Sequence, residues 1–143
     1  MAEPNTDVAP TNAPDQAILS GVIPYLTVSD ANAAADFYKR AFDAKEIARM
    51  PAKDGKRLMH CHLQINGGTV MLSDGFPEQG HPALPPQAFM LHQQVRHADP
   101  AWKRAIDAGC EVITPLDKMF WGDFYGQFRD PFGVVWSMGA TER

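Results

Sequence analysis

Cysteine is scarce in this chain, which has only Cys61 and Cys110 among its 143 residues. Their spacing fits neither a zinc motif nor a disulfide-rich scaffold, so we expect two reduced thiols in or near the core of a cytoplasmic protein. No apolar run approaches the roughly 18 residues that a membrane-spanning helix needs. There is also no excess of basic residues, because the net charge is −4. We therefore expect neither a membrane nor a nucleic acid as a partner.

Several catalytic and targeting motifs are missing as well. The sequence has no Gly-x-Ser-x-Gly elbow, no phosphate-binding glycine-rich loop and no Cys-x-x-Cys pair. The run Asn66-Gly67-Gly68 joins two predicted strands and opens no helix, so we interpret it as a turn. Residues 1–16 lack the basic and apolar regions of a secretory signal. Because they hold three prolines among small polar residues, residues 1–17 are predicted to be a disordered tail.

An internal repeat organises the rest of the chain. Residues 38–44 and 102–108 share the order aromatic, Lys, Arg, Ala, apolar, Asp, Ala, and a Glu with an apolar neighbour follows each copy. The copies lie 64 positions apart, which is far longer than a solenoid repeat. A chain of this length is predicted to form one domain, residues 18–143. We interpret the repeat as two copies of one module, about residues 18–74 and 88–139, an arrangement that builds a groove for a small molecule.

Each module is predicted to have the order β-α-β-β-β, which makes the chain an α+β protein. Apolar spacing at Ala34, Phe37 and Ala41 predicts the first helix, and Asp99 before Pro100 predicts the start of the second, with Gly109 as its stop. The proline-rich residues 75–87 are predicted to be a linker. The predicted strands are residues 18–28, 45–50, 58–65, 69–73, 89–95, 111–114, 124–129 and 134–138.

Five sequence segments resemble a known family. They are Pro24-Tyr25-Leu26 with Asp36-Phe37-Tyr38, then Met71-Leu72-Ser73-Asp74, then Phe120-Trp121-Gly122-Asp123-Phe124-Tyr125-Gly126, and finally Asp130-Pro131-Phe132-Gly133. From about Ile18 to Met138 the chain resembles the vicinal oxygen chelate superfamily, which includes glyoxalase I, bleomycin-resistance proteins and extradiol dioxygenases, and it looks closest to the PhnB-like branch. The resemblance implies curled mixed sheets around a cleft, helices on the outer face, and a homodimer.

The resemblance also tests for a metal cofactor. Metal-dependent members of the superfamily take their ligands from the first and last strand of each module, and the matching positions here are Ile23, Met71, Met90 and Ser137. An aliphatic side chain cannot coordinate a metal, and thioethers and a neutral serine are poor ligands for hard or borderline divalent ions. We therefore expect no metal and no other cofactor.

Strand alternation then predicts which side chains line the cleft. In residues 69–73, Val70 and Leu72 share one face and Met71 lies on the other, which is the more polar. The same argument in the other strands gives the predicted lining Tyr25, Thr27, His60, His62, Gln64, Met71, Met90, His92 and Ser137.

The histidines of this set allow three interpretations. His60 and His62 share a strand face, and His92 of the second module could meet them. Three imidazoles would suit Zn²⁺, Ni²⁺ or Cu²⁺, and a single one could act as a general base near neutral pH. The simplest alternative is that they are hydrogen-bonding wall residues or surface residues.

Aromatic residues near the end of the second module complete the predicted ligand site. Trp121, Phe124 and Tyr125 could stack on a planar ligand, although Trp121 could equally anchor its own loop. The sequence thus predicts a metal-independent protein that binds a small apolar or aromatic molecule in the cleft between the two modules. The alternative is a lyase or isomerase that acts on an enolisable carbonyl compound with a cleft histidine as base, with or without a non-standard metal site.

Overall fold

The computed structural model describes residues 19–143 of the chain. The predicted tail of residues 1–17 and the first residue of the first predicted strand, Ile18, lie outside the described residues. The fold is α+β, with two four-stranded mixed sheets and two α-helices. It divides into two compact units, one formed by residues 19–35 with Ala44–Ala83 and the other by Asp36–Asp43 with Leu84–Arg143.

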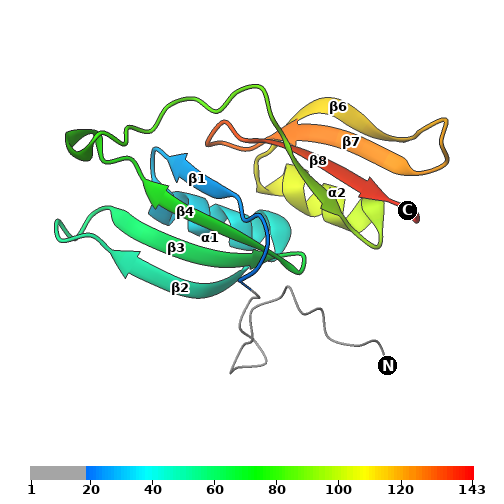
Figure 1. Cartoon of the computed structure of the whole chain (residues 1–143). Coiled ribbons are helices and arrows are strands. Elements are labelled where there is room, and N and C mark those ends of the chain that lie inside the picture. Colours follow the sequence, from blue (N-terminus) through cyan, green and yellow to red (C-terminus); the bar gives the residue numbers. More distant parts are fainter. Residues whose placement is uncertain (1–18) are drawn as a thin grey trace. The chain divides into compact units, whose positions relative to one another are not determined.

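The first unit holds the four strands of the first β-α-β-β-β module and the start of its helix up to Ala35, whereas the rest of that helix belongs to the second unit. Its sheet has the order β1-β4-β3-β2, in which β1 runs parallel to β4 and the other pairs are antiparallel (Figure 1). Pro24 precedes the edge strand β1, where its missing N–H breaks no ladder. The alternation Val70 and Leu72 inward, Met71 outward is confirmed by burial. The elements are β1 Tyr25–Val28, α1 Ala31–Phe42, β2 Lys45–Pro51, β3 Leu58–Ile65 and β4 Gly68–Asp74.

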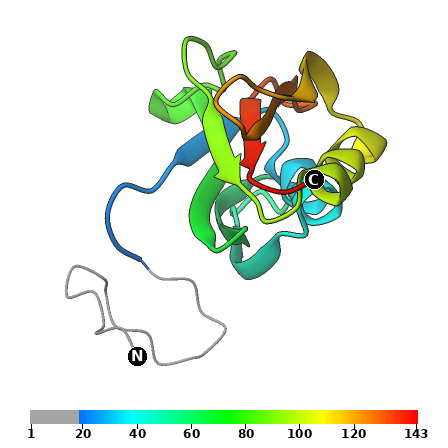
Figure 2. The same cartoon turned by 90° about the vertical axis from the view of Figure 1, so that its right-hand side faces the viewer.

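The second unit repeats this topology. Its sheet has the order β5-β8-β7-β6, and Figure 2 shows β5 (yellow-green) beside β8 (red), its parallel partner. The elements are β5 Leu91–Gln94, α2 Ala98–Ala108, β6 Glu111–Lys118, β7 Phe124–Arg129 and β8 Val135–Ala140. A short 3-10 helix, η1 Pro77–Gln79, is the one regular element within the predicted linker of residues 75–87.

The second unit is built around a buried carboxylate. Asp130, in the turn between β7 and β8, accepts hydrogen bonds at Oδ2 from Tyr38 Oη (2.5 Å) and Trp136 Nε1 (2.9 Å). Its Oδ1 accepts the backbone N–H groups of Phe132 (2.8 Å) and Val134 (3.0 Å). Tyr38 belongs to α1, so this carboxylate ties the second half of α1 to the hairpin. Burial, followed by the charge of Asp130, raises the pKa of the Tyr38 hydroxyl, which therefore remains a donor.

The start of α2 differs from the prediction. The helix begins at Ala98 with His97 at its N-cap, not after Asp99. The backbone N–H of Ala98 donates to Glu142 O at 2.9 Å, so a chain segment outside the helix satisfies one of the first unpaired N–H groups. Pro100 remains in the first turn, where a missing N–H breaks no helical bond. Gly109 ends the helix as predicted, with φ of 124°.

Candidate functional site

The exposed face of the first sheet carries a tyrosine–histidine pair. Tyr25 Oη and His60 Nδ1 are 2.9 Å apart, and the ring centroids lie 5.6 Å apart. In the register of the strands, Tyr25 lies opposite Met71, which in turn lies opposite His62. This cross-strand row follows from the alternation of side chains along each strand. Within the first unit, Tyr25, His60, His62 and Met71 therefore lie on the same face of the sheet, as predicted.

A β-bulge adds Met59 to the same region. Met50 pairs with His60, but Pro51 pairs with Leu58, so Met59 is an extra residue on β3. Strict alternation would send the Met59 side chain into the core beside Cys61. The bulge re-aims it instead, and Met59 is 54% exposed while Leu58 is buried.

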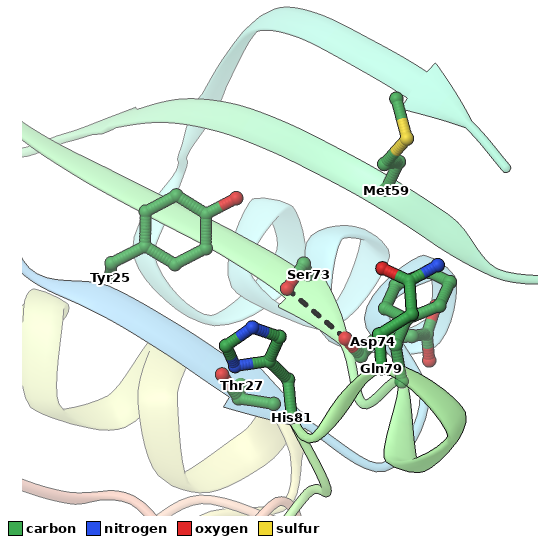
Figure 3. A pocket seen from close by; sticks show the side chains of 8 residues that line it. Tyr25, Thr27, Met59, Ser73, Asp74, Gln79 and His81 are labelled. Atoms are coloured by element: carbon green, nitrogen blue, oxygen red, sulfur yellow. Dashed lines mark hydrogen bonds between the residues drawn. The ribbon is translucent and has the colours of Figure 1, made fainter.

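Tyr25 and Met59 border a pocket of about 340 Å³. Figure 3 shows side chains of its lining: Tyr25 and Thr27 come from β1, Met59 from β3, Ser73 from β4, and Gln79 and His81 from the segment that follows β4. The volume lies within the range of about 300–1,000 Å³ typical of small-molecule sites. The complete lining is Tyr25, Thr27, Met59, Ser73, Asp74, Phe76, Gln79 and His81.

The acid in the lining has a structural task. Asp74 Oδ1 accepts the backbone N–H of Ala31 (3.0 Å), and Oδ2 accepts that of Leu58 (2.7 Å). The carboxylate thus caps the start of α1 and holds the strand next to the bulge. None of the lining residues is a lysine or arginine. The pocket therefore offers hydrogen-bonding groups and apolar surface, but no cation for an anionic ligand.

Arg57 holds the far wall of the pocket in place. Its guanidinium lies 4.3 Å above the ring of Phe76 and donates to Glu78 Oε1 (2.8 Å) and Asp54 Oδ2 (2.7 Å). The hydrogen bond from Arg57 holds the pKa of the Glu78 carboxyl below its usual range. The wall begins at Gly75, a position that requires glycine because a Cβ there would collide with the backbone nitrogen of Ala83. The segment that the sequence indicated only as a linker is therefore an ordered part of the pocket.

His62 is a buried histidine with an unused nitrogen. It is 5% exposed, and its Nε2 has no hydrogen-bond partner among the described residues. Burial, followed by the charge of neighbouring His60, lowers its pKa, so the neutral ring is favoured. His62 is not among the residues that line the pocket.

The remaining predicted residues form a second cluster, in the second unit. His92 Nδ1 lies 2.8 Å from Ser137 Oγ, and its Nε2 lies 3.0 Å from Gln94 Oε1. Both ring nitrogens are thus engaged, and a base role for His92 would require one of these bonds to break. The rings of Tyr125 and His92 are stacked, with their centroids 6.2 Å apart. The ring of Trp121 meets that of Tyr125 edge-on, with their centroids 6.1 Å apart.

The two positions in this unit that correspond to superfamily metal ligands are occupied in other ways. Met90 S accepts hydrogen bonds from Tyr125 Oη (3.7 Å) and Gln127 Nε2 (3.8 Å), and Ser137 Oγ is bound to His92. In the first unit the corresponding residues are Ile23 and Met71, a hydrocarbon and a thioether. These donors do not fit a divalent metal. Within residues 19–143, no three His, Cys, Asp or Glu side chains gather as a metal site would require.

The structure thus brings the predicted residues together in two groups. Tyr25, Thr27, His60, His62 and Met71 lie in the first unit, as does Gln64, which pairs with Thr69 at the far end of β3. Met90, His92, Trp121, Tyr125 and Ser137 lie in the second. The convergence of His92 with His60 and His62 stays a prediction. Sequence reasoning missed the pocket residues Met59, Ser73, Asp74, Phe76, Gln79 and His81, although Ser73 and Asp74 lie in a quoted motif.

Among residues 19–143, neither α-helix has the length and apolar composition of a membrane span.

Comparison with known proteins identifies the family. The model of the Glyoxalase/Bleomycin resistance protein/Dioxygenase superfamily matches residues 18–138. An uncharacterized protein of Mycobacterium bovis is 44% identical over 126 residues, which cover 84% of this chain and 82% of the relative.

Two solved structures share the fold. A Pseudomonas aeruginosa protein has a TM-score of 0.71 at 24% identity, over 85% of this chain and 98% of its own. The PhnB protein from Bacillus cereus has a TM-score of 0.65 at 17% identity, over 83% of this chain and 98% of its own. At these identities the likeness shows the architecture and not the activity.

Proposed function

We propose that this chain, which belongs to the Glyoxalase/Bleomycin resistance protein/Dioxygenase superfamily, is a PhnB-like member that binds a small, neutral, apolar or aromatic molecule without a metal. The observation that carries the proposal is the 340 Å³ pocket on the first sheet. Its lining combines two aromatic rings and a thioether with a hydroxyl pair, an amide and an imidazole. Such a mixture of apolar surface with few polar groups is typical of a ligand site.

The charge of the pocket argues for a neutral ligand. Its one acid, Asp74, keeps both carboxylate oxygens on backbone N–H groups, and no lysine or arginine lines the space. An anionic ligand would lose its hydration without gaining a cationic partner. A neutral ring can instead rest against Tyr25 and Met59 while a polar substituent reaches Thr27 or His81.

A matched pair of probes tests this reasoning. Indole-3-carboxamide and indole-3-carboxylate have the same ring and differ mainly in charge. Calorimetric titration at pH 8, where an ordinary histidine is neutral, should show the amide binding at least about 10-fold more tightly. Equal or tighter binding of the carboxylate would contradict the proposal.

Two pairs of variants assign the binding to the pocket. Met59→Ala should weaken binding of the amide, whereas Met50→Ala should not, because Met50 is similarly exposed (47%) but lies outside the lining. His81→Ala should likewise weaken it, whereas His97→Ala should not. Equal losses in each pair would place the binding elsewhere.

The tyrosine–histidine pair supports a second candidate function. His60 Nδ1 is held by Tyr25 Oη, and Tyr25 also lines the pocket, so a base could reach a bound enolisable carbonyl compound. The chain would then be a lyase or isomerase. Proton exchange at the α-carbon of dihydroxyacetone in D₂O tests this, and His60→Ala should slow it about 10²–10⁴-fold. Exchange no faster than in buffer alone would count against this candidate.

The proposal includes a cytoplasmic homodimer. Neither Cys61 nor Cys110 forms a disulfide, and both are buried, as expected in a reducing compartment. Light scattering during size-exclusion chromatography tests the dimer, for which a mass near 31.6 kDa, twice the chain's 15.8 kDa, is expected. A mass near that of one chain would contradict it.

A further inference from the structure

Both copies of the repeated Lys-Arg-Ala segment lie within the second unit. Residues 38–42 are at the end of α1, and residues 102–106 are in α2. Arg104 Nε donates to the backbone oxygen of Ala41 at 3.2 Å, so α2 contacts the end of α1 at the two repeats. The alanines that follow the arginines, Ala41 and Ala105, are both fully buried. The duplication thus places two matching arginines on neighbouring helices.

A groove runs between these helices. It is shallow and open to solvent, has a volume of about 510 Å³, and is lined by Arg40, Pro100, Lys103, Arg104, Asp107 and Ala108. The groove belongs to neither cluster of predicted site residues and is separate from the pocket on the first sheet.

The charges along the groove are unbalanced. Asp107 is its one acid, and this carboxylate pairs with Lys103 in the next turn of α2. Arg40 and Arg104 have no carboxylate partner within residues 19–143; Arg40 lies 5.6 Å from the ring of Phe37. Two positive charges therefore remain uncompensated, in a protein whose net charge is −4. Arginine forks bind phosphate through paired N–H donors, which makes this residue type suited to oxyanions.

We propose that this groove binds the phosphate or pyrophosphate group of a small molecule. The hydrogen bond to Ala41 fixes the Nε side of Arg104, which orders one guanidinium before the ligand arrives and lowers the entropy lost on binding. Arg40 supplies the second guanidinium from α1, so the ligand bridges the two helices. The groove is larger than a phosphate ion needs, and the extra space accommodates the organic part of a phosphate ester.

The test uses inorganic pyrophosphate as the probe, in calorimetric titrations of the full chain at low ionic strength. Arg40→Ser combined with Arg104→Ser should weaken binding by at least about 10-fold, because charge-assisted hydrogen bonds are lost at both sites. Arg96→Ser combined with Arg129→Ser removes the same charge from exposed positions outside the groove and should change binding less than about 2-fold.

Single variants keep the test independent of folding. Arg40→Ser removes an exposed side chain that makes no hydrogen bond within the described residues, and it alone should weaken pyrophosphate binding several-fold with unchanged circular dichroism. Equal losses in the groove and control double variants would show a general charge effect and overturn the proposal. Absence of binding to the unaltered chain, or tighter binding of a phosphoserine peptide than of pyrophosphate, would overturn it as well. Binding of the indole probes should be unchanged throughout, so this inference can fail independently of the proposed function.

Discussion

Replacing Asp130 with alanine should destabilise the second unit by about 4–6 kcal/mol. The Asp130 carboxylate is 3% exposed and accepts four hydrogen bonds, from Tyr38, Trp136 and two backbone N–H groups. Each buried donor left without a partner costs about 1–3 kcal/mol, so four donors set a range of roughly 4–12 kcal/mol. Water that enters the space left by the carboxylate would satisfy some of them, which favours the lower end.

Two further variants separate the hydrogen bonds from the volume of the side chain. Tyr38→Phe removes one donor and leaves the carboxylate with three, so we expect a loss of about 1–3 kcal/mol. Asp130→Asn keeps the size but turns an N–H₂ group toward Trp136 Nε1, which can only donate, so its loss should be intermediate. Introduced into the alanine variant, Tyr38→Phe should cost less than in the unaltered chain, because the tyrosine hydroxyl has already lost its acceptor.

Urea denaturation followed by tryptophan fluorescence and circular dichroism measures these losses. Trp136 lies in the affected hairpin, and its fluorescence contributes to the signal together with that of Trp102 and Trp121. A loss below about 1 kcal/mol for Asp130→Ala would refute the reasoning, and so would additive effects of the Tyr38 and Asp130 changes.

Three further predictions follow from local geometry. Burial and the charge of Asp130 raise the pKa of the Cys110 thiol to about 12. In a Cys61→Ser background, a thiol reagent at pH 8 should therefore label Cys110 only as fast as the chain unfolds. Immediate labelling would contradict this prediction. Gly126→Ala would place a Cβ 2.5 Å from Trp102 Cζ3. We therefore expect the free energy of unfolding, measured by urea denaturation, to fall by about 1–3 kcal/mol. An unchanged denaturation midpoint would contradict this prediction. Because the pKa of His62 is lowered in the folded chain, the unfolded chain takes up this proton first as the pH falls below about 6.5. The free energy of unfolding should therefore decrease from pH 7 to pH 5. His62→Gln should flatten this decrease, and an unchanged slope would contradict the prediction.

Much of the fold could be predicted because local signals and periodicity agreed. The strands over residues 58–65 and 124–129 match β3 and β7, since each is a β-rich run that ends at a turn with strong residue preferences. The duplicated segment gave the two-module order. The start of α2 could not be predicted, because it depends on a backbone hydrogen bond from Ala98 to Glu142, which lies 44 residues away in the sequence.

The candidate site was less accessible to sequence reasoning. Period-two alternation places Tyr25, His60 and Met71 on one face, but it also directs Met59 inward, and only the bulge opposite Pro51 reverses this. The wall that carries Gln79 and His81 depends on contacts of Arg57 with residues about 20 positions away. Its proline content indicated a linker and gave no sign of that order.

The most direct test of the proposed function is a ¹H–¹⁵N NMR titration of the chain with indole-3-carboxamide. Saturable shifts centred on the amides of Thr27, Met59, Ser73 and His81, reduced in Met59→Ala but not in Met50→Ala, are the predicted result. Saturable shifts centred on other residues, or no saturable shift at millimolar ligand, would contradict the assignment of this pocket as the binding site.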